Sequence, residues 1–61
     1  MIRKRWNDGK YAVNVRKFED GQISVGFWKV DKNGKLHDIR YKDLPKYVVA
    51  KIEEFEKEVG K

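Results

Sequence analysis

The chain contains no cysteine, a single proline and a single histidine. Without cysteine it forms no disulfide and no thiolate metal site, which excludes the disulfide-stapled folds of small secreted proteins. One histidine, His37, does not make a protein-only zinc site. No apolar run approaches the ~20 residues of a membrane span, and the basic start MIRKRWNDG lacks the apolar middle of a signal peptide. We expect an intracellular protein, cytoplasmic and nucleoid-associated or nuclear, without metal, cofactor or membrane contact.

Signatures of catalysis are also missing. The sequence has no glycine-rich phosphate loop and no dinucleotide fingerprint. His37 is followed by Asp38, but one such pair in a strand is no catalytic triad. His37 has the parity of its strand's apolar positions, which predicts a partly buried or edge histidine. The glutamates near the C-terminus, Glu53, Glu54, Glu56 and Glu58, lie beside lysines, which is typical of a solvated face. We predict no enzyme and no catalytic residue.

Positive charge is unevenly distributed along the 61 residues, a length that fits one domain. Residues 1–45 contain eleven Lys or Arg against six Asp or Glu, whereas residues 46–61 contain four of each sign. The whole net charge of +5 therefore lies in the N-terminal part. An excess confined to one element indicates an anionic partner. The alternative is a basic surface that serves solubility.

Alternating apolar and polar residues predict four strands, at residues 2–6, 10–18, 22–30 and 35–42. Three short turns separate them, at residues 7–9, 19–21 and 31–34, each containing glycine next to Asn or Asp. Tight turns connect antiparallel neighbours only. The four segments therefore predict an antiparallel meander.

The apolar period then changes to that of a helix, expected at residues 45–59 and ending at Gly60. Asp43 near the cap and Pro45 in the first turn indicate its start. One stripe contains Val48, Ile52, Phe55 and Val59. We expect it to cover the sheet face formed by Tyr11, Val13, Val15, Ile23, Val25, Phe27, Ile39 and Tyr41. The result is one α+β domain, residues 1–61, of ββββα order, with the sheet in residues 1–42.

The other sheet face collects cationic, small and aromatic side chains: Arg3, Arg5, Asn14, Arg16, Phe18, Ser24, Gly26, Trp28 and Arg40. Arginine pairs with phosphate and stacks on bases, and aromatic rings stack on unpaired bases. Gly26 and Ser24 are expected to leave room beside Trp28 for a flat ligand. Alternatively, Phe18 and Trp28 pack on another subunit, although burying unpaired arginines there is costly.

Three aromatic or apolar residues have two open interpretations. Trp6 either packs in the core or stands at the sheet edge near the basic patch. Tyr47 and Val49 lie outside the main helical stripe, and either fill the rim of the core or contact a second copy of the chain.

The run V-x-V-R-x-F at residues 13–18, and a next strand ending in Phe27-Trp28, resemble the single-stranded DNA-binding core of the transcriptional coactivator positive cofactor four. The order of elements matches over essentially the whole chain. The resemblance implies a homodimer joined through its helices, with phosphate contacts and base stacking on curved sheets. It implies ligand roles for Arg16, Phe18 and Trp28, with Lys17 and Lys29 as nearby cations. Gly26 and Phe27 depart from the charge usual in that family, and the segment after Gly34 is shorter.

Two other families share parts of the pattern. KDLPK before a helix is similar to the C-terminus of crenarchaeal seven-kilodalton chromatin proteins, which bind duplex DNA, although their barrel has five strands. IRKRWNDGKYAVNVR is similar to the arm-type DNA-binding domains of tyrosine integrases, which have three strands before the helix. All three resemblances imply DNA binding through a sheet face.

We therefore predict a non-enzymatic DNA-binding protein, a homodimer through its helix, that prefers single-stranded DNA and has little sequence specificity. The predicted contact residues are Arg3, Arg5, Asn14, Arg16, Lys17, Phe18, Trp28, Lys29 and Arg40. The alternatives are a chromatin-like or integrase-arm-like duplex binder, and a small protein-interaction or inhibitor module whose basic sheet docks on an acidic partner.

Overall fold

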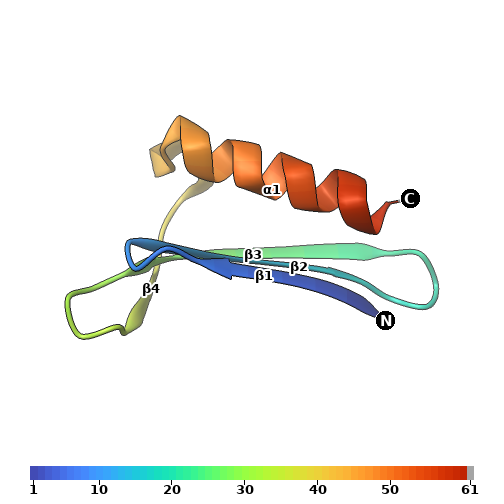
Figure 1. The fold of residues 1–61 in the computed structure, drawn as a ribbon, viewed down its shortest axis with the longest axis horizontal. Helices are drawn as coiled ribbons and strands as arrows, with labels where there is room; N and C mark the ends of the chain where they lie inside the picture. Colours follow the sequence, from blue (N-terminus) through green and yellow to red (C-terminus); the bar gives the residue numbers. More distant parts are fainter. Residues whose placement is uncertain (61) are drawn as a thin grey trace.

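A four-stranded antiparallel sheet forms one layer of the domain, and a single α-helix forms the other (Figure 1). The computed structural model describes residues 1–60, so Lys61, included above in the domain and in the charge count, lies outside the described residues. The strands are β1 (Ile2–Asn7), β2 (Tyr11–Lys17), β3 (Ile23–Val30) and β4 (Leu36–Asp38), in the order β1-β2-β3-β4. A 3₁₀ turn, η1 (Tyr41–Asp43), and helix α1 (Lys46–Val59) follow. The predicted α+β class and ββββα order are confirmed, and the first three strands end within one residue of the predicted bounds.

Side-chain carboxylates and glycines fix the hairpin turns. Gly21 has φ 91°, a left-handed conformation that glycine adopts without strain. It allows the Gly21 N–H to donate to the Phe18 carbonyl at 3.0 Å. In the first turn, Asp8 Oδ1 accepts the N–H groups of Lys10 and Tyr11, both at 2.8 Å. Local hydrogen bonds therefore set the strand register before any long-range packing is needed.

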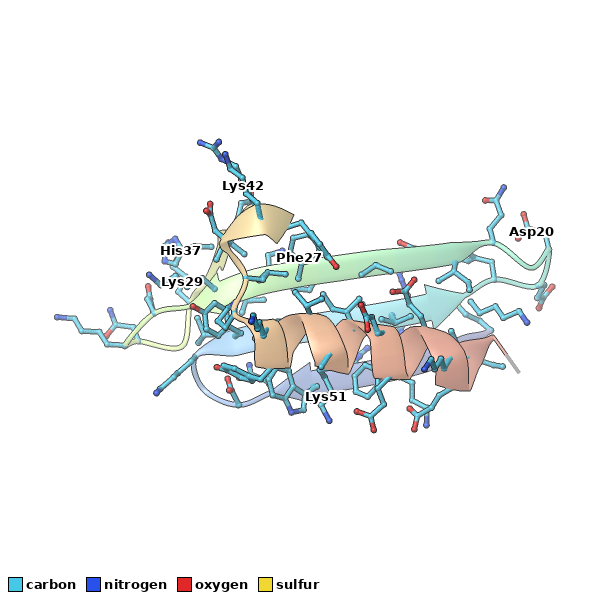
Figure 2. All side chains as sticks on the ribbon, turned by 90° about the horizontal axis from the view of Figure 1, so that it is seen from above. Asp20, Phe27, Lys29, His37, Lys42 and Lys51 are labelled. Carbon is cyan, nitrogen blue, oxygen red and sulfur yellow. The ribbon has the colours of Figure 1, made fainter. Side chains whose placement is uncertain are left out.

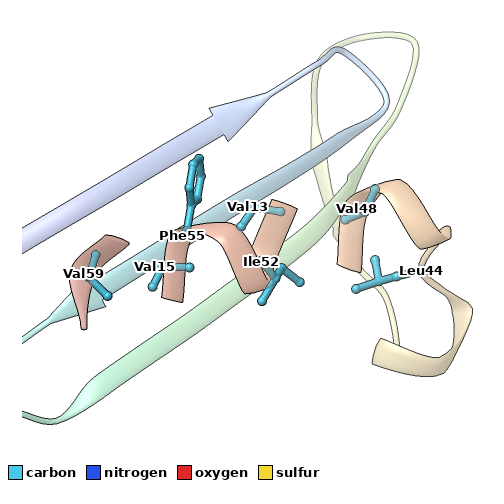
Figure 3. Packing of buried hydrophobic residues seen from close by; sticks show 7 residues of the cluster. All are labelled: Val13, Val15, Leu44, Val48, Ile52, Phe55 and Val59. Carbon is cyan, nitrogen blue, oxygen red and sulfur yellow. The ribbon is translucent and has the colours of Figure 1, made fainter. Parts of the chain in front are cut away.

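The core lies between α1 and the centre of the sheet (Figure 3). The predicted helical stripe is confirmed, since its four members are all buried: Val48, Ile52, Phe55 and Val59. They pack on Val13 and Val15 of β2 and on Leu44, which precedes the helix. Val15, Val48 and Val59 are completely shielded from solvent. Successive odd positions of β2 thus hold the helix on one face of the sheet.

The helix covers less of the sheet than the sequence predicts. It packs on β2 and β1, while β3 runs beside it rather than beneath it (Figure 2). The expected burial of Ile23 and Tyr41 is wrong, because their residues remain 43% and 52% exposed. Strands are ~4.8 Å apart and a helix with its side chains is ~10 Å wide. One helix therefore covers about two strands.

The fourth strand is shorter than predicted, because it ends at Asp38 rather than near residue 42. After Asp38 the chain leaves the sheet and turns toward the helical layer. Ile39 packs against the core, and the Tyr41 ring meets Phe27 edge-on with centroids 5.9 Å apart. The chain must leave the sheet after Asp38 for Leu44 to reach the core. The alternating pattern of residues 35–42 does not show this early end of the strand.

The helix begins as predicted next to Pro45, which occupies the N-cap position. The capping role expected of Asp43 is wrong: Asp43 belongs to η1, and no side chain among residues 1–60 caps the start of α1. Instead, the Pro45 carbonyl accepts hydrogen bonds from the N–H groups of Val48 and Val49. Proline's fixed φ begins the helix here without a capping side chain.

Aromatic side chains close the β1 side of the core. Trp6 packs against the core, and its ring meets Tyr47 edge-on at 6.2 Å, so the core interpretation of Trp6 is confirmed. The Tyr47 hydroxyl donates to Asp8 Oδ2 at 3.1 Å, which ties the helix to the first turn. Tyr47 and Val49 therefore both contact the core or rim of their own chain. No helix within residues 1–60 has the length and apolar character needed to cross a bilayer.

Candidate nucleic-acid interface

The sheet face opposite α1, called the open face below, carries most of the predicted contact residues. The strand register arranges most of its side chains in three cross-strand rows, and Val30 and Leu36 form a further pair at one end. One row contains Arg3, Arg16 and Ser24; the next contains Arg5, Asn14 and Gly26; the third contains Asn7, Ala12, Trp28 and Asp38. Asp38 is thus the one acidic side chain that the strand register places on this face. The open face is predominantly cationic.

Three arginines lie close together on two neighbouring strands. Arg3 and Arg16 are direct cross-strand partners, and Arg5 is two residues from Arg3 on β1. Arg3 and Arg5 are exposed, and Arg16 is half-buried. Within residues 1–60, the ion pairs involve other side chains, so none of these three guanidinium groups is neutralised by a carboxylate. Like charges placed side by side repel, and an anion between them relieves that repulsion.

Trp28 is held against the sheet by the absence of a side chain at Gly26. The two residues are on the same face of β3, and the benzene end of the indole lies directly over Gly26. A Cβ built at Gly26 would be 2.5 Å from Trp28 Cη2, much closer than real contacts. The expectation that Gly26 leaves room for a flat ligand is therefore wrong, since the Trp28 ring itself occupies that space.

Phe18 stands at the far end of the open face, one residue beyond β2. Its residue is 38% exposed, and the Arg16 guanidinium carbon lies 5.5 Å from the centre of its ring. This cation–π contact positions the arginine next to an exposed aromatic surface. Arg16 and Phe18 are thus brought together as predicted.

Three of the predicted contact residues lie away from the open face. Lys17 and Lys29 have the parity of Tyr11, so they project from the face that carries α1 (Lys29 is labelled in Figure 2). Arg40 follows the end of β4 and flanks η1, so it has no place in the sheet rows. The expected position of Arg40 on the open face is therefore wrong, whereas Lys17 and Lys29 were expected only as nearby cations. The other members project as predicted: Arg3, Arg5, Asn14, Arg16, Phe18 and Trp28.

A hollow of about 370 Å³ opens beside Trp28 on the open face. Its lining includes Arg5, Asn7, Ala12, Asn14, Trp28 and Leu36. Ala12 is only 7% exposed although it faces away from the helix. Asn14 is half-buried, and its Oδ1 is a covered acceptor with no hydrogen-bond partner among residues 1–60.

Five residues that line the hollow were not among the predicted contacts: Trp6, Asn7, Ala12, Val13 and Leu36. Asn7 was assigned to a turn, although it is the last residue of β1 and pairs with Ala12. The parity of Ala12 and Leu36 did place them on this face. What the sequence could not show is that Trp28 and Leu36 lie close enough to enclose a space above Ala12.

His37 is the middle residue of β4, where it pairs with Lys29 of β3. Its Nε2 lies 2.8 Å from Asp31 Oδ2, and its side chain is 51% exposed. It is thus an exposed edge histidine rather than a partly buried one. The hydrogen bond with His37, followed by that from the Lys35 N–H, lowers the pKa of Asp31 below its usual value of 3.8. In the part of the chain that the structure describes, no three His, Cys, Asp or Glu side chains are grouped to hold a metal ion.

Comparisons with models of protein families, with curated proteins and with solved structures found no match to this chain.

Proposed function

We propose that this protein is a non-enzymatic DNA-binding domain that holds unpaired strands against its open face. The observation that carries the proposal is the juxtaposition of three unneutralised arginines with Trp28 on one side of one sheet. Arginines attract and orient phosphates, while an aromatic ring stacks on bases of any sequence. The combination suits a ligand that offers both groups at short intervals.

A single strand fits this face better than a duplex does. Stacking on Trp28 requires a base whose own face is free, and in a duplex both faces of each base are covered by neighbouring pairs. The Trp28 ring lies along the sheet surface and lines the hollow, rather than projecting as a wedge between base pairs. The resemblance to the single-stranded DNA-binding core of positive cofactor four agrees with this preference.

Binding is expected to be largely electrostatic. Each phosphate neutralised on a single strand contributes about −0.7 to the slope of log K against log salt. Three arginines therefore predict a slope of about −2 from this face alone. Little sequence specificity follows, because phosphate contacts carry no base information.

The proposal is tested by titrating the protein with oligo-dT and with a hairpin duplex of equal charge, each at two salt concentrations. Trp6→Phe leaves Trp28 as the one fluorescent tryptophan, and Phe keeps an aromatic ring against Tyr47. Quenching together with tighter binding of oligo-dT supports the proposal. Preference for the duplex favours a chromatin-like role, and no binding of either nucleic acid favours a protein partner.

The homodimer through α1 stays a prediction. Tyr47 is 48% exposed, although its hydroxyl and ring edge are used within the chain. Sedimentation equilibrium with and without oligo-dT measures the mass directly. A monomer in both conditions contradicts the dimer without affecting the proposed binding face.

A further inference from the structure

The polar side chains that line the hollow present mainly hydrogen-bond donors. Arg5 has N–H groups and no acceptor. Asn7 Oδ1 already accepts the Gly9 N–H at 2.8 Å, and the NH₂ group of this amide is available to donate to a ligand. Asn14 Oδ1 is covered by protein atoms, so the exposed part of its amide is also the NH₂ group. Three side chains from two strands thus present N–H groups to the same space.

The opposite wall and the floor are apolar. Trp28 and Leu36 stand on β3 and β4, and Ala12 lies between them and the polar wall. Leu36 is 46% exposed, so its side chain has surface left to contact a ligand. The benzene end of the Trp28 ring packs over Gly26, and this contact holds the indole at the edge of the hollow. A flat ring with hydrogen-bond acceptors along one edge matches both walls at once.

Among the bases, thymine and guanine present such an edge. On the edge that faces the major groove of a duplex, thymine has O4 beside its methyl group, and guanine has O6 and N7 side by side, which an arginine can contact with two hydrogen bonds. Cytosine and adenine carry an amino group on the corresponding edge, N4 and N6 respectively. An amino group placed against N–H donors leaves both sides without an acceptor, which is unfavourable.

We propose that the hollow beside Trp28 holds one base of the bound strand and prefers the keto bases, thymine and guanine. The inference rests on the proposed function and adds to it a binding site for one base. Asn14 and Arg5 are the specificity-determining residues, and Trp28 and Leu36 supply the apolar contact. A phosphate in the hollow would gain donors from Arg5 and Asn14, but nothing from Trp28, Leu36 and Ala12.

The test compares the dissociation constants of (dT)₈ and (dC)₈, two pyrimidine strands of equal length and charge. For the unmodified chain we expect (dT)₈ to bind about three- to tenfold more tightly, the effect of one net hydrogen bond. Asn14→Val should reduce that ratio toward one. Valine suits a strand and removes a covered acceptor without a partner, so the variant is expected to fold. Ser24→Val, on the same face but outside the hollow, should leave the ratio unchanged.

Equal affinity of the unmodified chain for the two strands overturns the proposed base-binding site. It would mean that the hollow holds a phosphate group, or that no part of the strand enters it. A (dT)₈ preference that Asn14→Val leaves intact also overturns it. Neither result affects the proposed function, because both include binding. Failure of the unmodified chain to bind either strand overturns both the proposed function and the proposed base-binding site.

Discussion

The benzene end of the Trp28 indole lies over Gly26, two residues earlier on the same strand, where a Cβ would be 2.5 Å from Cη2. The glycine thereby determines how the largest aromatic group of the open face is presented. Gly26 thus controls the position of the ring for which base stacking is proposed.

Gly26→Ala is expected to displace the Trp28 ring and weaken binding of oligo-dT. The loss should not exceed the ~1–3 kcal/mol typical of removing one stacked base. The fold should persist, because the ring tip can move toward solvent more easily than the strand can shift. Fluorescence titration in the Trp6→Phe background measures both the changed ring environment and the affinity. In a Trp28→Ala background, Gly26→Ala should have no further effect on affinity; an equal loss there contradicts the relationship.

Arg16→Ala is expected to reduce the salt dependence of oligo-dT binding by about 0.7 in the slope of log K against log salt. The reason is that Arg16 projects from the open face beside Arg3. Lys17→Ala is the matched control, since it removes the same charge at the adjacent residue but on the face that carries α1. Equal reductions in the two variants would mean that net charge, rather than the open face, attracts the strand.

Ile52→Val is expected to lower the free energy of unfolding by ~0.5–1.5 kcal/mol, because Ile52 is on the buried side of α1 and only 2% exposed. Ile23→Val removes the same methylene at a residue that is 43% exposed beside the helix, and should change stability by less than ~0.5 kcal/mol. Urea denaturation monitored by circular dichroism compares the two. A larger effect at Ile23 would mean that another surface covers β3 in solution.

Acid is expected to destabilise the fold partly through Asp31. Its pKa is lowered in the folded state, first by the hydrogen bond with His37 and then by the Lys35 N–H. A group with a lowered folded pKa stabilises the fold above its unfolded pKa, near 3.8, and that contribution disappears as the pH falls through the folded pKa. Thermal unfolding between pH 5 and 2 should therefore show a weaker pH dependence in Asp31→Asn. The same pH dependence of thermal unfolding in the unmodified chain and in Asp31→Asn would mean that Asp31 does not contribute to acid destabilisation.

The elements of this fold could be predicted from sequence where local chemistry decides them. Alternation and the glycine turns locate β1, β2 and β3, and the spacing of Val48 to Val59 locates the helix and its buried side. The end of β4 could not be predicted, because tertiary packing of Ile39 and Leu44 overrides an alternating pattern.

The candidate site could be predicted only in part. Parity placed Arg3, Arg5, Arg16 and Trp28 on one face, and the register confirms that placement. Parity also puts Lys17 and Lys29 on the opposite face, and they were included because of the resemblance. The contact between Trp28 and Gly26, and the hollow above Ala12, depend on side-chain positions that spacing does not specify.

The serial order of the strands has a consequence for how fast the chain folds. Every strand pairs with the one before it, so the sheet assembles from hairpins that each close a short loop. The contact of Tyr47 with Asp8 spans 39 residues, and a 14-residue helix is marginal without its core partners. Helix docking is therefore expected to follow hairpin formation, with folding faster than in β-sandwiches. Stopped-flow kinetics would then show Val59→Ala mainly accelerating unfolding and Gly21→Ala mainly slowing folding.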